Sequence, residues 1–188
     1  MMNSRRKVNK DNVHMATALN NANLSKDYDT QVSALIIDKN GKTVSTGYNG
    51  GVRECSDRAI PYSRKSHTCR LHPNSVEIIT QLFPGETDLL SDIEVIDGTA
   101  MLPFEANKYP FMIHAEANAI LFTDNMNRLD GATIYCTHFP CPNCALMIAQ
   151  VGIERVVCPI GCATSTTKET IKESLYTFQL AGIEVSLI

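Results

Sequence analysis

The sequence lacks a long apolar run, and this absence excludes a membrane-spanning helix. No apolar stretch approaches the ~20 residues that a helix needs to cross a bilayer. The basic start at Arg5, Arg6 and Lys7 is not followed by the apolar segment of a secretory signal, so we expect no export. Seven cysteines in such a chain predict free thiols and metal ligands, not disulfides, and therefore a cytoplasmic protein.

The sequence also lacks an excess of positive charge. It has 17 Lys and Arg against 20 Asp and Glu, a net charge of −3, and no basic stripe beyond residues 5–7. A protein that binds the phosphate backbone of a nucleic acid depends on such a stripe, so we expect no nucleic-acid partner. A length of 188 residues predicts a single domain over 1–188, with an insertion around 52–110.

Two short stretches carry the chemistry, His114-Ala115-Glu116 and Pro140-Cys141-Pro142-Asn143-Cys144. Two thiolates three residues apart at a helix start, together with an imidazole, form a ligand set typical of zinc. This leaves Glu116 free to move protons beside the metal. The pattern is the signature of zinc-dependent nucleobase deaminases, in which zinc lowers the pKa of its bound water.

A closed structural zinc site is the alternative interpretation of these residues. Structural sites usually contain two short ligand pairs on loops, whereas here each motif opens an apolar helical run. We therefore favour a catalytic site with His114, Cys141 and Cys144 as ligands and Glu116 as the general acid and base. Cys158 and Cys162 could also bind metal, but cysteines near a strand end are more often small buried hydrophobes.

Hydrophobic periodicity predicts an α/β protein with a mixed five-stranded sheet and helices on both faces, a three-layer α-β-α arrangement. The expected helices are one capped by Asp11, then 74–82, 115–126, 141–150 and 166–181, the last capped by Ser165 or Thr166. The expected strands are 32–37, 43–48, 132–137, 155–159 and 184–187, with an Asn-Gly turn between the first two. The acidic stretch 86–102 is expected to be a surface excursion.

Two further segments have open interpretations. The loop Gly47-Tyr48-Asn49-Gly50-Gly51 follows a strand and is either a simple turn or a ligand-binding loop, whose glycines would let the backbone approach a ligand. The segment after it contains four metal-binding side chains close together in sequence: Cys55, His67, Cys69 and His72. A second zinc there is a hypothesis, although the spacing matches no tight motif.

Several stretches resemble the deoxycytidylate (dCMP) deaminases of the cytidine deaminase superfamily. They are Ser25-Lys26-Asp27, Gln31-Val32, Gly47-Tyr48-Asn49-Gly50, Lys108-Tyr109-Pro110, His114 to Ile120, Phe139-Pro140-Cys141 with Cys144, Gly152-Ile153 and Ala181-Gly182-Ile183. The resemblance implies a cytidine-deaminase-like fold and hydrolytic deamination of dCMP to dUMP and ammonia, which supplies dUMP for thymidylate synthesis.

The resemblance also implies roles for individual residues. Asn49 would bind the deoxyribose, Ala115 would offer its backbone to the base edge, and Phe139 or Tyr109 would pack on the pyrimidine. Some viral relatives carry a second zinc near the segment that holds Cys55. For the substrate phosphate, the candidates are Arg53, Arg58 and Arg128.

Regulation is implied by the same resemblance. Related enzymes are homo-hexamers that dCTP activates with Mg²⁺ and dTTP inhibits, and the resemblance places nucleotide contacts at Gly47, Tyr48, Gly50 and Gly51. The alternatives are a cytidine or deoxycytidine deaminase, activity on dCTP, a nucleic-acid-editing deaminase and a non-catalytic zinc protein.

Overall fold

The computed structural model describes residues 8–56, 59–85, 91–163 and 166–188. The chain divides into two compact units, each with its own sheet. The first contains the chain up to Val52 and again Met112–Ile188, and the second is Arg53–Phe111. The second unit covers the segment expected to be an insertion.

The first unit is built on a mixed five-stranded sheet, as the sequence predicts. In order across the sheet, its strands are β2 (Thr43–Tyr48), β1 (Ser33–Ile37), β6 (Thr133–Cys136), β7 (Arg155–Cys158) and β8 (Glu184–Leu187). β1 is antiparallel to both β2 and β6, and β6, β7 and β8 are parallel to one another. Parallel neighbours need crossover connections, and helices provide them here.

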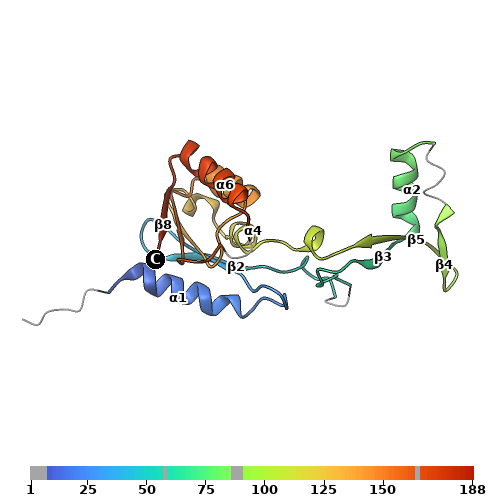
Figure 1. Ribbon diagram of the computed structural model, residues 1–188, viewed down its shortest axis with the longest axis horizontal. Coiled ribbons are helices and arrows are strands. Elements are labelled where there is room, and N and C mark those ends of the chain that lie inside the picture. The colour runs from blue at the N-terminus through green and yellow to red at the C-terminus, as the bar shows by residue number, and fades with distance from the viewer. Residues whose placement is uncertain (1–7, 57–58, 86–90, 164–165) are drawn as a thin grey trace, which may run out of the picture. The chain divides into compact units, whose positions relative to one another are not determined.

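Helices cover both faces of this sheet and give three layers. α1 (Lys10–Ala22) lies on one side, and α4 (Ala115–Leu121), α5 (Pro142–Gln150) and α6 (Lys168–Leu180) pack on the other (Figure 1). β1 shows why both faces need cover, because all five of its residues are buried. Ala34 and Ile36 face the three-helix side, and Leu35 and Ile37 face α1.

Helix starts and ends differ from the sequence prediction by a few residues. α1 is capped by Asn9, whose side chain accepts hydrogen bonds from the backbone of Asp11 and Asn12. α4 ends at Leu121, not 126, and a short 3₁₀ turn at Met126–Arg128 follows it. Thr167 caps α6 in place of Thr166, and the other expected cap, Ser165, lies outside the described residues.

Asn9 takes the capping role, and Asp11 instead anchors α1 to the sheet. Its carboxylate accepts hydrogen bonds from Arg155 at 2.9 and 3.0 Å and from the Tyr135 hydroxyl at 2.7 Å. The hydrogen bond from Arg155, followed by that from Tyr135, lowers the pKa of Asp11 below its usual value. The ion pair is partly shielded, with both side chains less than a third exposed.

Replacing Asp11 with asparagine is expected to lower the free energy of unfolding at pH 7 by about 1–2 kcal/mol. Since the folded-state pKa lies below the unfolded value, this contribution is complete above about pH 4 and is lost as pH falls through the folded-state pKa. Urea denaturation at pH 7, 5 and 3 should therefore show a gap between wild type and variant that is equal at pH 7 and 5 and narrower at pH 3. Asp124→Asn, at an exposed position, is the matched control. A gap that stays constant down to pH 3 would contradict this role for Asp11.

The second unit contains a three-stranded antiparallel sheet in the order β3-β5-β4, with one helix against β5. Its elements are β3 (His67–Leu71), α2 (Pro73–Leu82), β4 (Glu94–Ile96) and β5 (Thr99–Ala106). The hairpin between β4 and β5 is a departure from the expected surface excursion. Its turn is Asp97-Gly98, both with positive φ, and Asp-Gly is a strong hairpin signal that sequence reasoning overlooked.

Within the described ranges, none of the helices is both long enough and apolar enough to cross a membrane.

Candidate metal centre and catalytic carboxylate

The structure brings His114, Cys141 and Cys144 together, as the sequence predicts. Nδ1 of His114 lies 3.4 Å from Sγ of Cys141 and 3.5 Å from Sγ of Cys144. A tetrahedral ion with bonds of 2.0–2.3 Å holds its ligand atoms about 3.5–3.8 Å apart, so these spacings fit zinc. Among the residues that the structure describes, this is the only group of three or more such side chains close enough to hold a metal ion.

The group is assembled from the starts of two helices. His114 is the N-cap of α4, Cys141 is the N-cap of α5, and Cys144 lies in the first turn of α5. Pro142 occupies the first turn, where its missing N–H costs no hydrogen bond. A helix N-terminus carries partial positive charge and therefore favours thiolates over thiols. His114 is exposed and Cys144 is buried, so the centre opens to solvent on the histidine side.

One thiol of the group is strongly acidified by its neighbours. Hydrogen bonds from Cys144 and then from His114 lower the pKa of Cys141 to about 4, against the opposing effect of burial. A thiolate is the form of cysteine that binds metal. The protein therefore holds at least one sulfur ready as an anionic ligand.

Glu116 lies beside this group, in the first turn of α4, and is only 4% exposed. Burial raises the pKa of its carboxyl above the usual value, and the nearby His114 opposes this shift. A carboxyl whose pKa is raised by burial holds a proton more readily, which suits a group that must both accept and return one. His114 and Glu116 come from one short helix, so their relative positions are set by its first turn.

The loop after β2 runs beside the residue that precedes His114. Gly50 and Ile113 exchange backbone hydrogen bonds of 3.1 and 2.7 Å. Asn49 is 8% exposed, and its amide donates to Thr30 O and to the Asp27 carboxylate and accepts from Val32 N. Both donors are thus used within the protein, which leaves one carbonyl lone pair of Asn49 for a ligand.

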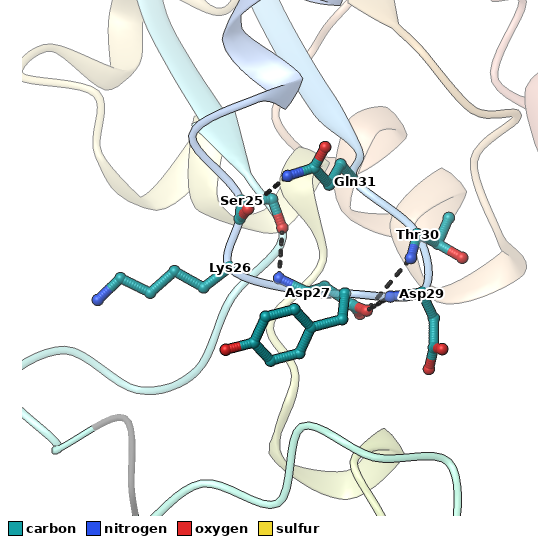
Figure 2. Close-up of a pocket in the computed structure, with 7 residues that line it drawn as sticks. Ser25, Lys26, Asp27, Asp29, Thr30 and Gln31 are labelled. Atoms are coloured by element: carbon teal, nitrogen blue, oxygen red, sulfur yellow. Dashed lines mark hydrogen bonds between the residues drawn. The ribbon is translucent and has the colours of Figure 1, made fainter.

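Asn49 also fixes the loop between α1 and β1. Residues Ser25–Gln31 line a cavity of about 350 Å³, and their hydrogen bonds are drawn in Figure 2. Asp27 caps the backbone of Asp29 and Thr30, while Ser25 donates to the carbonyl of Asn49 at 2.8 Å. The Ser-Lys-Asp stretch noted in the sequence is therefore a structural support of the loop that carries Asn49.

The expected base-packing residues have different surroundings. Phe139 is buried and packs edge-on against Phe178, with ring centroids 6.4 Å apart, so its ring belongs to the core. Ala115 is buried at the start of α4. Tyr109 belongs to the second unit, in a 3₁₀ turn at Tyr109–Phe111, and its side chain is largely exposed.

The structure does not bring the four candidate ligands of a second zinc together. Cys55 is exposed in the irregular segment before β3, His67 and Cys69 lie two residues apart on β3, and His72 is the N-cap of α2. No three of them approach one another closely enough within the described residues. Cys158, the other weak candidate, is fully buried in the core, and Cys162 packs against it.

The structure describes two of the three arginines considered for the substrate phosphate. Arg128 donates to Asp38 at 2.8 Å and to the carbonyl of Thr43, so it braces the β1–β2 hairpin. Arg53 lies in the second unit, and Arg58 lies outside the described residues. Arg128 therefore has a structural role.

Sequence reasoning overlooked two buried polar residues near the centre. Asn118 donates from its side chain to the carbonyl of Tyr48 at 2.8 Å, and Ser45 donates to the carbonyl of Ala119. A polar residue within the apolar run from Ala115 to Ile120 was the available signal. Both bonds join β2 to α4.

Comparisons with known proteins agree with this site. Residues 8–160 match the family model described as the cytidine and deoxycytidylate deaminase zinc-binding region. A probable deoxycytidylate deaminase of Drosophila melanogaster is 37% identical over 147 residues, which cover 78% of this chain and 57% of the relative. The human deoxycytidylate deaminase is 32% identical over 143 residues, or 76% of this chain and 60% of the relative. The chain thus spans less than two thirds of the length of these curated relatives.

A solved structure shows the same fold. A dCMP deaminase from the cyanophage S-TIM5, in complex with dCMP and dUMP, aligns over 98% of this chain and 100% of its own with a TM-score of 0.60 and 23% identity. This likeness confirms the predicted fold class. Together with the match of the family model over most of the sequence, the histidine and two cysteines at the starts of α4 and α5 establish that the chain belongs to the cytidine and deoxycytidylate deaminase family.

Proposed function

We propose that this protein is a zinc-dependent hydrolase that deaminates dCMP to dUMP and ammonia. One observation carries the proposal: a buried carboxyl, Glu116, lies two residues after His114 beside a ligand set whose spacings fit zinc. The curated relatives named deoxycytidylate deaminase support dCMP as the substrate. His114, Cys141 and Cys144 would hold the metal.

Bound zinc would supply Lewis acidity, which lowers the pKa of a coordinated water to roughly 7. Glu116 takes a proton from the attacking water and donates it to the ring nitrogen N3 of cytosine. A second proton passes through Glu116 to the 4-amino group, which leaves as ammonia while the water oxygen remains on C4. Because Glu116 is only 4% exposed, bulk water would compete little for these protons.

Substrate contacts are part of the proposal. Asn49 would accept a hydrogen bond from the sugar hydroxyl through its remaining lone pair, since both of its donors are used. The backbone of Ala115 at the start of α4 would contact the base edge, and the resemblance gives Phe139 or Tyr109 as the ring that would pack on the pyrimidine.

We extend the proposal to regulation, on the strength of the resemblance in the Gly-Tyr-Asn-Gly loop. The protein would be a cytoplasmic homo-hexamer that dCTP activates with Mg²⁺ and dTTP inhibits, and that supplies dUMP for thymidylate synthesis. Tyr48, Gly50 and Gly51 would provide the nucleotide contacts. Size-exclusion chromatography with light scattering, with and without dCTP and Mg²⁺, tests the hexamer.

The substrate is tested by ammonia release from dCMP, deoxycytidine and dCTP in parallel. We expect strong turnover of dCMP, raised by dCTP with Mg²⁺ and suppressed by dTTP. Turnover of deoxycytidine alone would reject dCMP as the substrate while keeping the zinc mechanism. No ammonia release from any of the three compounds would reject the proposed activity. Binding to single-stranded DNA or RNA, measured by fluorescence anisotropy, would then test a nucleic-acid deaminase.

A further inference from the structure

Strand β2 and helix α4 approach each other most closely at Gly47. A β-carbon built on Gly47 would lie 2.3 Å from the carbonyl oxygen of Ala115, 2.3 Å from the amide nitrogen of Ala119 and 2.8 Å from the carbonyl carbon of Asn118. All three are backbone atoms, so no side chain can turn aside to make room. Gly47 has an ordinary negative φ, so the glycine is required by space and not by backbone conformation.

Two hydrogen bonds hold the helix in register on either side of this contact. Ser45 donates to the carbonyl of Ala119, and the side chain of Asn118 donates to the carbonyl of Tyr48 at 2.8 Å. Ser45 and Gly47 in β2 and Asn49 just after it occupy alternate positions and are all buried, while Thr46 is exposed. One face of β2 is therefore shaped to receive α4.

The residues that α4 presents to the metal centre are His114 at its N-cap and Glu116 in its first turn. α4 has only seven residues, so a shift at Ala115 or Ala119 moves both of them. The remaining ligands, Cys141 and Cys144, belong to α5. The distance between β2 and α4 therefore sets how His114 meets the two thiols.

We propose that Gly47 is a positioning residue, whose missing side chain sets the seating of α4 and thereby places His114 and Glu116 opposite the cysteines. This gives Gly47 a role different from the nucleotide contact that the resemblance implies, because the space at its α-carbon is filled by the helix. The expected effect of Gly47 on catalysis rests on the proposed function. The expected effect of Gly47 on the metal centre does not depend on which substrate is used.

Gly47→Ala tests the inference. Ordinary contact of a β-carbon would require α4 to move on the order of 1 Å. Displacement of a catalytic group by that distance can cost about 100-fold in rate, so we expect kcat/KM for dCMP to fall about 100-fold, mainly in kcat. In protein loaded with Co²⁺ in place of zinc, the visible d–d absorption should change in position and intensity, and the affinity for Co²⁺ should fall.

Thr46→Ala is the matched control, since its side chain is on the opposite face of β2 and bonds with Asn21 and the carbonyl of Ala34. It should keep the wild-type Co²⁺ spectrum. Circular dichroism establishes whether Gly47→Ala is folded; if it is not, Ser45→Ala, which removes a hydrogen bond without adding volume, should alter the spectrum in its place. The inference is overturned if folded Gly47→Ala protein keeps the wild-type spectrum and Co²⁺ affinity. If Gly47→Ala does not fold, the same result for Ser45→Ala overturns it. A wild-type protein inactive on dCMP, with the spectral change still present in the variant, would instead reject the proposed function alone.

Discussion

Replacing Glu116 with glutamine is expected to lower kcat for dCMP by about 10²–10⁴-fold while zinc stays bound. Glutamine has nearly the same shape as glutamate but cannot accept or return a proton at neutral pH. Because Glu116 is not among the three residues whose ligand atoms come together, the metal content should not change. Ammonia release and zinc content, measured on the same preparation, separate the two effects.

A second carboxyl provides the control for this substitution. Glu173 lies exposed on α6, and Glu173→Gln makes the same chemical change away from the centre, so its turnover should match wild type. If Glu116→Gln retained wild-type turnover with zinc bound, the metal would be structural and the proton-transfer role of Glu116 would be excluded.

Replacing Cys144 with serine is expected to remove zinc and, with it, deaminase activity. Cys144 is 1% exposed, and a neutral serine hydroxyl is a far weaker zinc ligand than a thiolate. Changes to residues that only support ligands cost 10–100-fold in metal affinity, so loss of a direct ligand should exceed about 100-fold. The melting temperature should also fall, because the metal would link the starts of α4 and α5.

Cys69→Ser is the matched control and also tests the second zinc. Cys69 is half-buried on β3, and its Sγ has no two metal-binding neighbours among the described residues. We therefore expect Cys69→Ser to retain the wild-type zinc content of one equivalent per chain. A loss of one equivalent on Cys69→Ser, with turnover kept, would establish a second zinc in Arg53–Phe111. Full zinc content in Cys144→Ser would exclude Cys144 as a ligand.

The metal centre could be predicted from the sequence because it depends on local geometry. Cys141 and Cys144 are three residues apart beside prolines that begin a helix, and such residues share one face of the first turn. His114 and Glu116 belong to the start of another helix in the same way. Only the contact between the starts of the two helices depends on the tertiary structure. The resemblance to the deaminase family predicted that contact.

Predictions were weaker where two side chains compete for one local role. Asn9 and Asp11 are both good helix caps, and the choice between them was decided by Arg155 and Tyr135, which are distant in sequence and bind Asp11. β5 was not predicted from the sequence, and it contains Pro103, a residue type that argues against a strand. The Asp97-Gly98 turn was the local signal that outweighed the proline.

By itself, the sequence determined the mixed sheet and which three possible metal ligands come together, and it is the basis for proposing Glu116 as the general acid and base, because each of these depends on spacing along the chain or on the order of elements. The tertiary structure alone decided which residues support the site. Asn49 uses its donors to hold a loop, Arg128 is paired with Asp38, and Gly47 makes room for α4. These roles depend on which segments pass close to one another, and close approach between a strand and a helix leaves no periodic pattern in the sequence.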